Sequence, residues 1–157
     1  MNIETYRDLQ EIVKDKNKFS MLRTVEINPT ELCNRKCSFC PRSDKKIYPN
    51  RNNHIDVVTV ENLCKGLRDI NFTNRVGFVG FGEPLLCKTL IPSIKKVKEI
   101  LPNLDWLEIN TNGDKLSYKK IKELYEAGLT NIVISMYDKG RTDYFNKLKK
   151  DIPINLI

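Results

Sequence analysis

Residues 31–42 read ELCNRKCSFCPR and hold three cysteines within eight positions. These are Cys33, Cys37 and Cys40, in the spacing C-x3-C-x2-C. Soft thiolate ligands bind zinc, copper(I) or iron–sulfur clusters in proteins. Structural zinc takes four protein ligands, whereas three thiolates on a four-iron cluster leave one iron open for a ligand from outside the protein. The stretch therefore indicates a metal centre with three protein ligands, and a [4Fe–4S] cluster fits the spacing better than zinc.

Zinc with a remote fourth ligand stays open as an alternative. The chain has five cysteines and one histidine, so few other cysteine or histidine ligands exist. Cys87 follows a polar turn from which it can approach the cysteine loop, whereas Cys64 falls on an apolar helix face and is expected in the core. His54 lies in a polar loop and is expected to be solvated.

Composition bounds the class of protein. The 157 residues are 40% hydrophobic and 30% charged, which is typical of a soluble globular domain. No apolar run of about 18 residues is present, and the N-terminal residues do not resemble a signal peptide. We therefore predict a cytoplasmic protein without a membrane partner, in which a cysteine cluster binds metal or acts in catalysis rather than forming disulfides.

The net charge of +7 does not favour a nucleic-acid partner. The lysines gather in short runs, at 95–98 and 119–122, within helical patterns that also contain acids. Such runs are typical of solvated helix faces.

Apolar periodicity predicts strands that alternate with helices. A leading helix is predicted over 2–19. The strands that follow are expected near 23–29, 75–81, 105–112, 131–137 and 152–157, and the helices after an N-cap at Thr59, over 88–100, after Ser117 and over 142–150. This alternation predicts an α/β fold with a parallel sheet built from βαβ units. Strands 75–81 and 131–137 are apolar on both faces, as in a sheet covered by helices.

Ligands of such sheets lie beyond the carboxyl ends of the strands. The segments that follow the strands are polar or contain glycine. They are the cysteine loop, GEP at 82–84, NTNG at 110–113 and SMYD at 135–138. We expect the functional site there.

These segments resemble the radical S-adenosylmethionine (SAM) superfamily. The three-cysteine motif, with Phe39 before its last cysteine, resembles that family's cluster loop. GFGEP at 80–84 resembles its glycine-glycine-glutamate-proline motif, with Phe81 at the usual first glycine. TNG and SMYD match the segments after the third and fourth strands. The resemblance covers residues 22–157. Within it, the sequence PTELCNRKCSFCPR is most similar to that of members with a SPASM-type auxiliary-cluster domain.

The resemblance implies a fold, cofactors and roles for particular residues. The fold is a partial (β/α) barrel of the TIM type, and Cys33, Cys37 and Cys40 ligate a [4Fe–4S] cluster whose open iron is chelated by SAM. The cofactor-binding residues implied are Phe39, Gly82, Glu83, Asn112 and Ser135. Gly82 and Glu83 would meet the methionine amino group, and the backbone at Phe39 the adenine. Both Asn112 and Ser135 also have a purely structural alternative. For Asn112 it is a tight Asn-Gly turn alone, and for Ser135 it is a buried hydroxyl bonded to the backbone.

The implied reaction is an oxidoreductase-type reductive cleavage of SAM to a 5′-deoxyadenosyl radical that abstracts a substrate hydrogen. It requires an electron donor such as a flavodoxin or ferredoxin. The substrate is open among peptides, sugars and nucleotides. The family barrel has six βα units and this chain reaches four, so we expect a barrel incomplete at its C-terminus, with a lead-in at 1–21 and the barrel domain at 22–157. A non-catalytic iron–sulfur or zinc module that needs a partner chain remains the alternative.

Overall fold

The computed structural model describes residues 21–137 and 139–150. The predicted helix over 2–19 and the predicted strand over 152–157 lie outside the described residues. Among the described residues, no helix has both the length and the apolar character that crossing a membrane requires.

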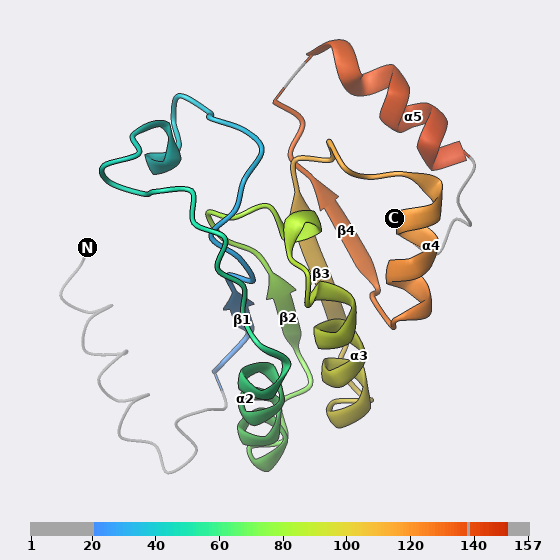
Figure 1. The fold of residues 1–157 in the computed structure, drawn as a ribbon. Coiled ribbons are helices and arrows are strands. Elements are labelled where there is room, and N and C mark those ends of the chain that lie inside the picture. Colours follow the sequence, from blue (N-terminus) through green and yellow to red (C-terminus); the bar gives the residue numbers. More distant parts are fainter. Residues whose placement is uncertain (1–20, 138, 151–157) are drawn as a thin grey trace, which may run out of the picture.

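Four parallel strands form one sheet, which confirms the predicted fold class. The strands are β1 (Thr24–Ile27), β2 (Arg75–Phe78), β3 (Trp106–Thr111) and β4 (Asn131–Ile134), and they pair in the order β1-β2-β3-β4. Each strand therefore lies beside the next one in the sequence. All four carboxyl ends point to the same end of the sheet, where the cysteine loop lies (Figure 1).

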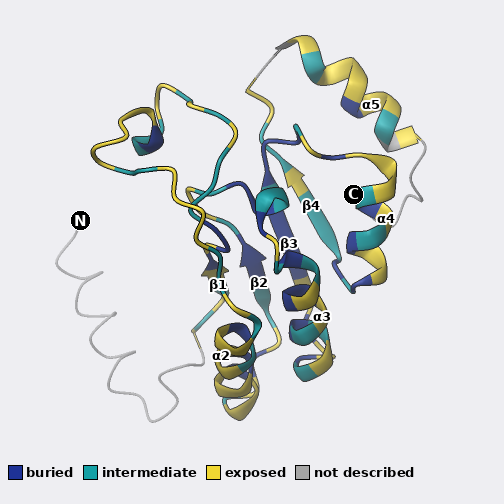
Figure 2. Cartoon of the chain, viewed as in Figure 1, coloured by how far each residue is buried: buried dark blue, intermediate teal, exposed yellow. Residues whose placement is uncertain are grey.

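The helices that connect the strands cover one face of this sheet (Figure 1). They are α2 (Val57–Asp69), α3 (Leu90–Ile100) and α4 (Tyr118–Glu126), and α5 (Thr142–Lys150) follows β4. Apolar side chains of the helices meet the strand residues Val76, Phe78, Leu107 and Ile109 in the hydrophobic core. Buried residues accordingly concentrate in β2, in β3 and on the inward faces of the helices (Figure 2). Ser117 caps α4 as predicted, since its side chain accepts a hydrogen bond from the Lys120 amide.

The other face of the sheet is not covered by the described helices (Figure 1), whereas the apolar patterns at 75–81 and 131–137 predicted a sheet covered by helices. Side chains alternate along a strand, so Trp106, Glu108 and Asn110 share the face that the helices do not cover. Glu108 is buried there, where it pairs with Arg75 and accepts a hydrogen bond from the Trp106 indole at 2.6 Å. Val133 of β4 is 41% exposed. This face is therefore polar and partly open among the described residues.

The N-cap of α2 is Asp56, so the prediction of Thr59 is wrong. The Asp56 carboxylate accepts hydrogen bonds from the Thr59 amide at 2.6 Å and the Thr59 hydroxyl at 2.9 Å. Thr59 lies in the first turn of the helix instead. Both residue types favour N-caps, and the carboxylate adds a charge that suits the positive end of the helix dipole.

We expect Asp56→Asn to make the free energy of unfolding depend less on pH. Hydrogen bonds from the Thr59 amide and hydroxyl lower the pKa of the Asp56 carboxyl from its ordinary value of 3.8. Because the folded pKa lies below the unfolded one, this contribution is present above the unfolded pKa and is lost as pH falls through the folded pKa. The stability difference between wild type and Asp56→Asn should therefore be largest near neutral pH and shrink below about pH 4.

Urea unfolding at a series of pH values measures this difference. Asp69→Asn is the matched control, because Asp69 lies exposed at the other end of α2. A stability difference for Asp56→Asn that stays constant across the whole range would contradict the expectation.

Candidate functional site

The cysteine loop leaves β1 and returns on itself through backbone hydrogen bonds. The Cys40 amide donates to the Cys37 carbonyl at 3.0 Å, and the Ser43 amide donates to the Cys40 carbonyl at 2.9 Å, in a 3₁₀ turn over Pro41–Ser43. The Arg35 amide donates to the Cys33 sulfur at 3.4 Å. The thiolate is the form of cysteine that binds metal.

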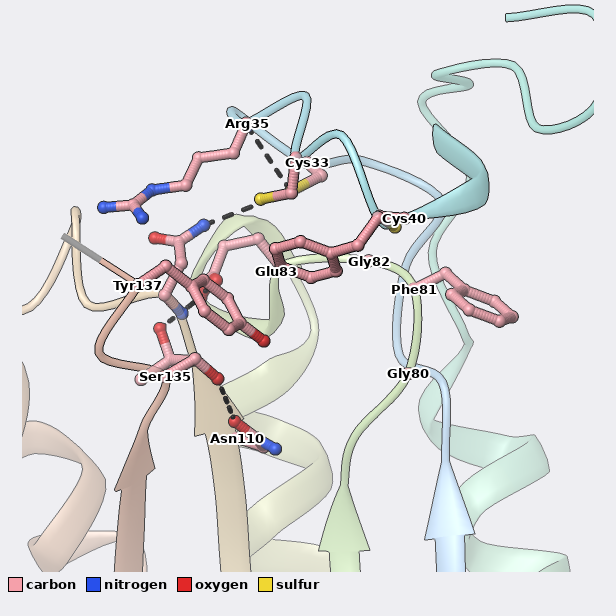
Figure 3. A pocket seen from close by; sticks show the side chains of 14 residues that line it. Cys33, Arg35, Cys40, Gly80, Phe81, Gly82, Glu83, Asn110, Ser135 and Tyr137 are labelled. Carbon is pink, nitrogen blue, oxygen red and sulfur yellow. Dashed lines mark hydrogen bonds between the residues drawn. The ribbon is translucent and has the colours of Figure 1, made fainter. Parts of the chain in front are cut away.

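The structure brings every predicted site residue to one cavity of about 120 Å³ at the carboxyl ends of the strands (Figure 3). The walls come from the cysteine loop and from the segments after β2, β3 and β4. The predicted residues that line it are Cys33, Cys37, Phe39, Cys40, Gly82, Glu83, Asn112 and Ser135. Arg35, Gly80, Phe81, Asn110, Thr111 and Tyr137 complete the lining. The three thiols are free and half-buried, hence accessible from the cavity.

Gly82 allows close packing between two loops of the protein. A Cβ atom built on Gly82 would lie 1.8 Å from the carbonyl oxygen of Thr30, which no side chain can tolerate. The neighbouring Glu83 amide donates to the Leu32 carbonyl at 2.7 Å. The segment after β2 is thus fixed against the start of the cysteine loop, and this contact alone requires a glycine.

The Glu83 carboxylate is occupied by hydrogen bonds within the protein. Its side chain is only 2% exposed. One oxygen accepts from the Thr111 hydroxyl at 2.5 Å and from the Leu85 amide at 3.1 Å, and the other accepts from the Asn112 amide at 2.8 Å. Glu83 therefore ties the ends of β2 and β3 together at the floor of the cavity. A carboxylate has about four acceptor positions, so these three bonds leave one of them unused.

Asn112 and Ser135 make the local hydrogen bonds expected of a tight turn and of a structural hydroxyl, and both also line the cavity. The Asp114 amide donates to the Asn112 side-chain oxygen at 2.9 Å, and Gly113 has a φ of +74°, which together define a tight turn. The Asn112 side-chain nitrogen lies 4.0 Å from the Cys33 sulfur. The Ser135 hydroxyl donates to the Asn110 side-chain oxygen at 3.0 Å (Figure 3).

Two exposed aromatic rings stand over the cavity. Phe39 is 68% exposed, and its ring meets Tyr137 edge-on with the centroids 4.8 Å apart. Phe81, which replaces the first glycine of the family motif, points away from the cavity (Figure 3) and packs against Tyr48. Its side chain therefore does not obstruct the space beside Gly82.

A carboxylate that sequence reasoning missed holds the cysteine loop to the segment after β3. Asp114 accepts from the Arg35 Nε and Nη2 atoms at 2.7 and 2.6 Å and from the Asn34 side chain at 2.6 Å, and it also pairs with Arg141. We call this group the Asp114 clasp. Asp114 lies two residues beyond Asn112, in a turn whose composition gives no sign of four donors.

The remaining cysteines and the histidine do not line the cavity. Cys64 is buried in the core, as predicted, and burial raises the pKa of its thiol to about 11. The buried Cys87 thiol donates to the Pro29 carbonyl at 3.2 Å. His54 is half-buried rather than solvated, and its backbone pairs with that of Thr30 in an isolated antiparallel β-bridge. In the part of the chain that the structure describes, no three His, Cys, Asp or Glu side chains converge as ligands of a single metal ion.

The donor set fits an iron–sulfur cluster with one open iron. Each cluster thiolate binds a different iron, so the three sulfurs need to surround a volume and not a single point. The three thiols line one cavity, and no acidic side chain other than the internally bonded Glu83 lies among its walls. The glycines and polar groups opposite the thiols leave room for a non-protein ligand.

The chain belongs to the radical SAM superfamily, whose sequence profile matches residues 27–137, well over half of its length. Proteins of this family use a [4Fe–4S] cluster and SAM. The likeness to SPASM-type members stays a prediction.

Two related proteins are named as enzymes. The SAM-dependent 2-deoxy-scyllo-inosamine dehydrogenase of Niallia circulans is 34% identical over 119 residues, which cover 76% of this chain and 45% of that protein. The GTP 3′,8-cyclase of Chlorobaculum tepidum is 30% identical over 132 residues, covering 81% of this chain and 36% of that protein. The structure of BtrN in complex with AdoMet and 2-DOIA matches with a TM-score of 0.73 and 27% identity, over 85% of this chain and 53% of that one. The chain spans about half or less of the length of these relatives.

Proposed function

We propose that this chain holds a [4Fe–4S] cluster through Cys33, Cys37 and Cys40 and binds SAM at the open iron, as part of a radical SAM enzyme. The observation that supports it most is the joint lining of one cavity by the three thiols and by the polar ends of three further strands. Bound together, the cluster and SAM supply one-electron cleavage of SAM to a 5′-deoxyadenosyl radical. We retain residues 22–157 as the proposed barrel domain.

The residues around the thiols would position the cofactor and limit its access to water. Gly82 keeps the segment after β2 close to the cysteine loop, and the rigid backbone beside it suits the methionine amino group. Glu83 orients the Asn112 amide. Phe39 and Tyr137 offer an aromatic wall for the adenine, with the Ser135 hydroxyl nearby.

We extend the proposal to the substrate class and the reductant. The named relatives act on 2-deoxy-scyllo-inosamine and on GTP, which are both hydroxylated small molecules. Asn110, on the uncovered face of the sheet, also lines the cavity and is a polar group that suits such a substrate. A peptide substrate has no comparable support. The electron would come from a flavodoxin- or ferredoxin-type donor.

The test is anaerobic reconstitution with iron and sulfide, followed by reduction and EPR spectroscopy with and without SAM. We expect a [4Fe–4S] signal that shifts when SAM is added, because the amino and carboxylate groups of SAM would change the ligands of the open iron. Cys37→Ala should abolish the signal and lower the iron content. Cys64→Ala is the matched control, since it removes a core thiol that does not line the cavity.

Other results would reject the proposal in different ways. A cluster whose signal does not respond to SAM would favour the alternative, a non-catalytic iron–sulfur module that needs a partner chain. Bound zinc without any cluster would exclude the radical SAM reading of the cysteine loop. Equal iron loss in Cys64→Ala and Cys37→Ala would mean that the three-cysteine motif is not the ligand set.

A further inference from the structure

A second cavity, of about 490 Å³, is lined by the cysteine loop and by the segment that follows it, as far as Asn50. It shares only Cys33 and Arg35 with the proposed cofactor cavity. Its lining residues are Cys33, Asn34, Arg35, Lys36, Arg42, Lys45, Tyr48 and Asn50. Four of these are cationic and none is acidic. Arg35 is already paired with Asp114, so the charges that remain belong to Arg42, Lys36 and Lys45.

Arg42 is a buried cation without a carboxylate among the partners that the described residues provide. It is 5% exposed, and its guanidinium lies over the Tyr48 ring, 4.9 Å from the centroid. Its Nη2 atom donates to the Glu31 carbonyl at 2.5 Å and to the Asn50 side-chain oxygen. Its Nη1 atom is buried and has no partner within the described chain. Burying a charge with an unused donor is costly unless a counter-charge completes the site.

The arginine is held in place by the loop that surrounds the cavity. The Asn50 side-chain oxygen that accepts from Arg42 also accepts from the Cys33 amide at 2.9 Å. Tyr48 is fixed in turn by the Asn28 side chain, which donates to its hydroxyl at 3.1 Å. The Lys36 and Lys45 side chains are exposed and therefore free to turn toward a bound anion. The cavity thus combines a guanidinium that is held by hydrogen bonds with two exposed lysines beside it.

Guanidinium groups bind phosphoryl oxygens in a fixed, charge-assisted geometry, and lysines add positive charge without that constraint. The volume lies in the range of about 300–1,000 Å³ found for small-molecule sites, so it exceeds what a bare phosphate needs. We propose that this second cavity binds the phosphoryl group of a small molecule, with Arg42 as the anchor and Lys36 and Lys45 as supporting cations. The inference does not rest on the proposed radical chemistry.

The experiment is calorimetric titration of the cluster-loaded full chain with pyrophosphate at constant ionic strength. We expect one saturable site. Arg42→Lys keeps the buried charge but loses the planar guanidinium that can donate two parallel hydrogen bonds. It should weaken binding about tenfold or more. Lys45→Gln, an exposed substitution that leaves the packing intact, should weaken binding several-fold. Lys122→Gln, on the exposed face of α4, is the matched control and should bind as wild type does.

Titration with ADP, compared with pyrophosphate, distinguishes two sources of the phosphoryl group. Tighter binding of ADP than of pyrophosphate identifies a nucleotide, and equal or weaker binding identifies a free oxyanion. The proposal is overturned if no saturable binding occurs, or if Arg42→Lys and Lys45→Gln bind as Lys122→Gln does. Binding that exists only in cluster-free protein would overturn it too, because the cluster would then supply the counter-charge of Arg42.

Discussion

Replacing Glu83 with alanine is expected to lower the free energy of unfolding by about 3 kcal/mol or more. The substitution removes the acceptor of three hydrogen bonds in a buried setting, and it leaves the Asn112 amide, the Leu85 amide and the Thr111 hydroxyl to find other partners. Buried donors without acceptors retain the full cost of their desolvation. Urea unfolding of the cluster-free protein measures the loss directly.

Glu83→Gln separates the carboxylate from the shape of the side chain. The amide retains one acceptor oxygen and should cost less than alanine, about 1–2 kcal/mol. Glu126→Ala, at the exposed end of α4, serves as the matched loss of a glutamate and should leave stability almost unchanged. If Glu83→Ala proves as stable as Glu126→Ala, the proposed tie between β2 and β3 does not contribute to folding.

Asp114→Ala is expected to loosen the cysteine loop. It removes one carboxylate that accepts from Arg35 and Asn34 of the cysteine loop and pairs with Arg141 of the segment before α5. The side chain is 23% exposed, so solvent replaces part of what is lost, and we expect a cost of about 2 kcal/mol. A loop with fewer tethers should also release a reconstituted cluster several-fold faster to an iron chelator.

The release rate is the readout that separates a positioning role from a general loss of stability. Asp105→Ala is the matched control, because Asp105 is exposed in the loop before β3. Asp114→Ala protein that releases iron as slowly as Asp105→Ala protein would show that the Asp114 clasp stabilises the fold without holding the loop.

The order of strands and helices was predictable because each element carries its own local signal. Strands β1 to β4 are short segments that each contain several apolar residues, and α3, α4 and α5 show apolar side chains at helical spacing within a residue or two of the predicted bounds. The site was predictable for a topological reason, since the carboxyl ends of parallel strands must meet at one edge. Eight residues drawn from four separate segments therefore line one cavity.

The interactions between side chains were not predictable in the same way. The Asp114 clasp joins residues that lie 79 positions apart, and neither Arg35 nor Asp114 stands in a periodic pattern. The internal bonds of Glu83 depend on how closely β2 and β3 approach, which the motif itself does not encode. The buried interactions of Glu108 could not be predicted for a related reason. A single acid in a mostly apolar strand does not indicate that Arg75 and Trp106 lie beside it.

The large sequence separation between Arg35 and Asp114 in the Asp114 clasp has a consequence for the newly made chain. Arg35 leaves the ribosome well before its partner, and at about 5–20 residues per second the 79 positions between them correspond to roughly 4–16 seconds of translation. During that interval the three thiols are already made, but the carboxylate that restrains their loop is not. Iron delivered co-translationally would meet an untethered loop. Insertion after release of the finished segment would meet a loop already restrained in its folded position.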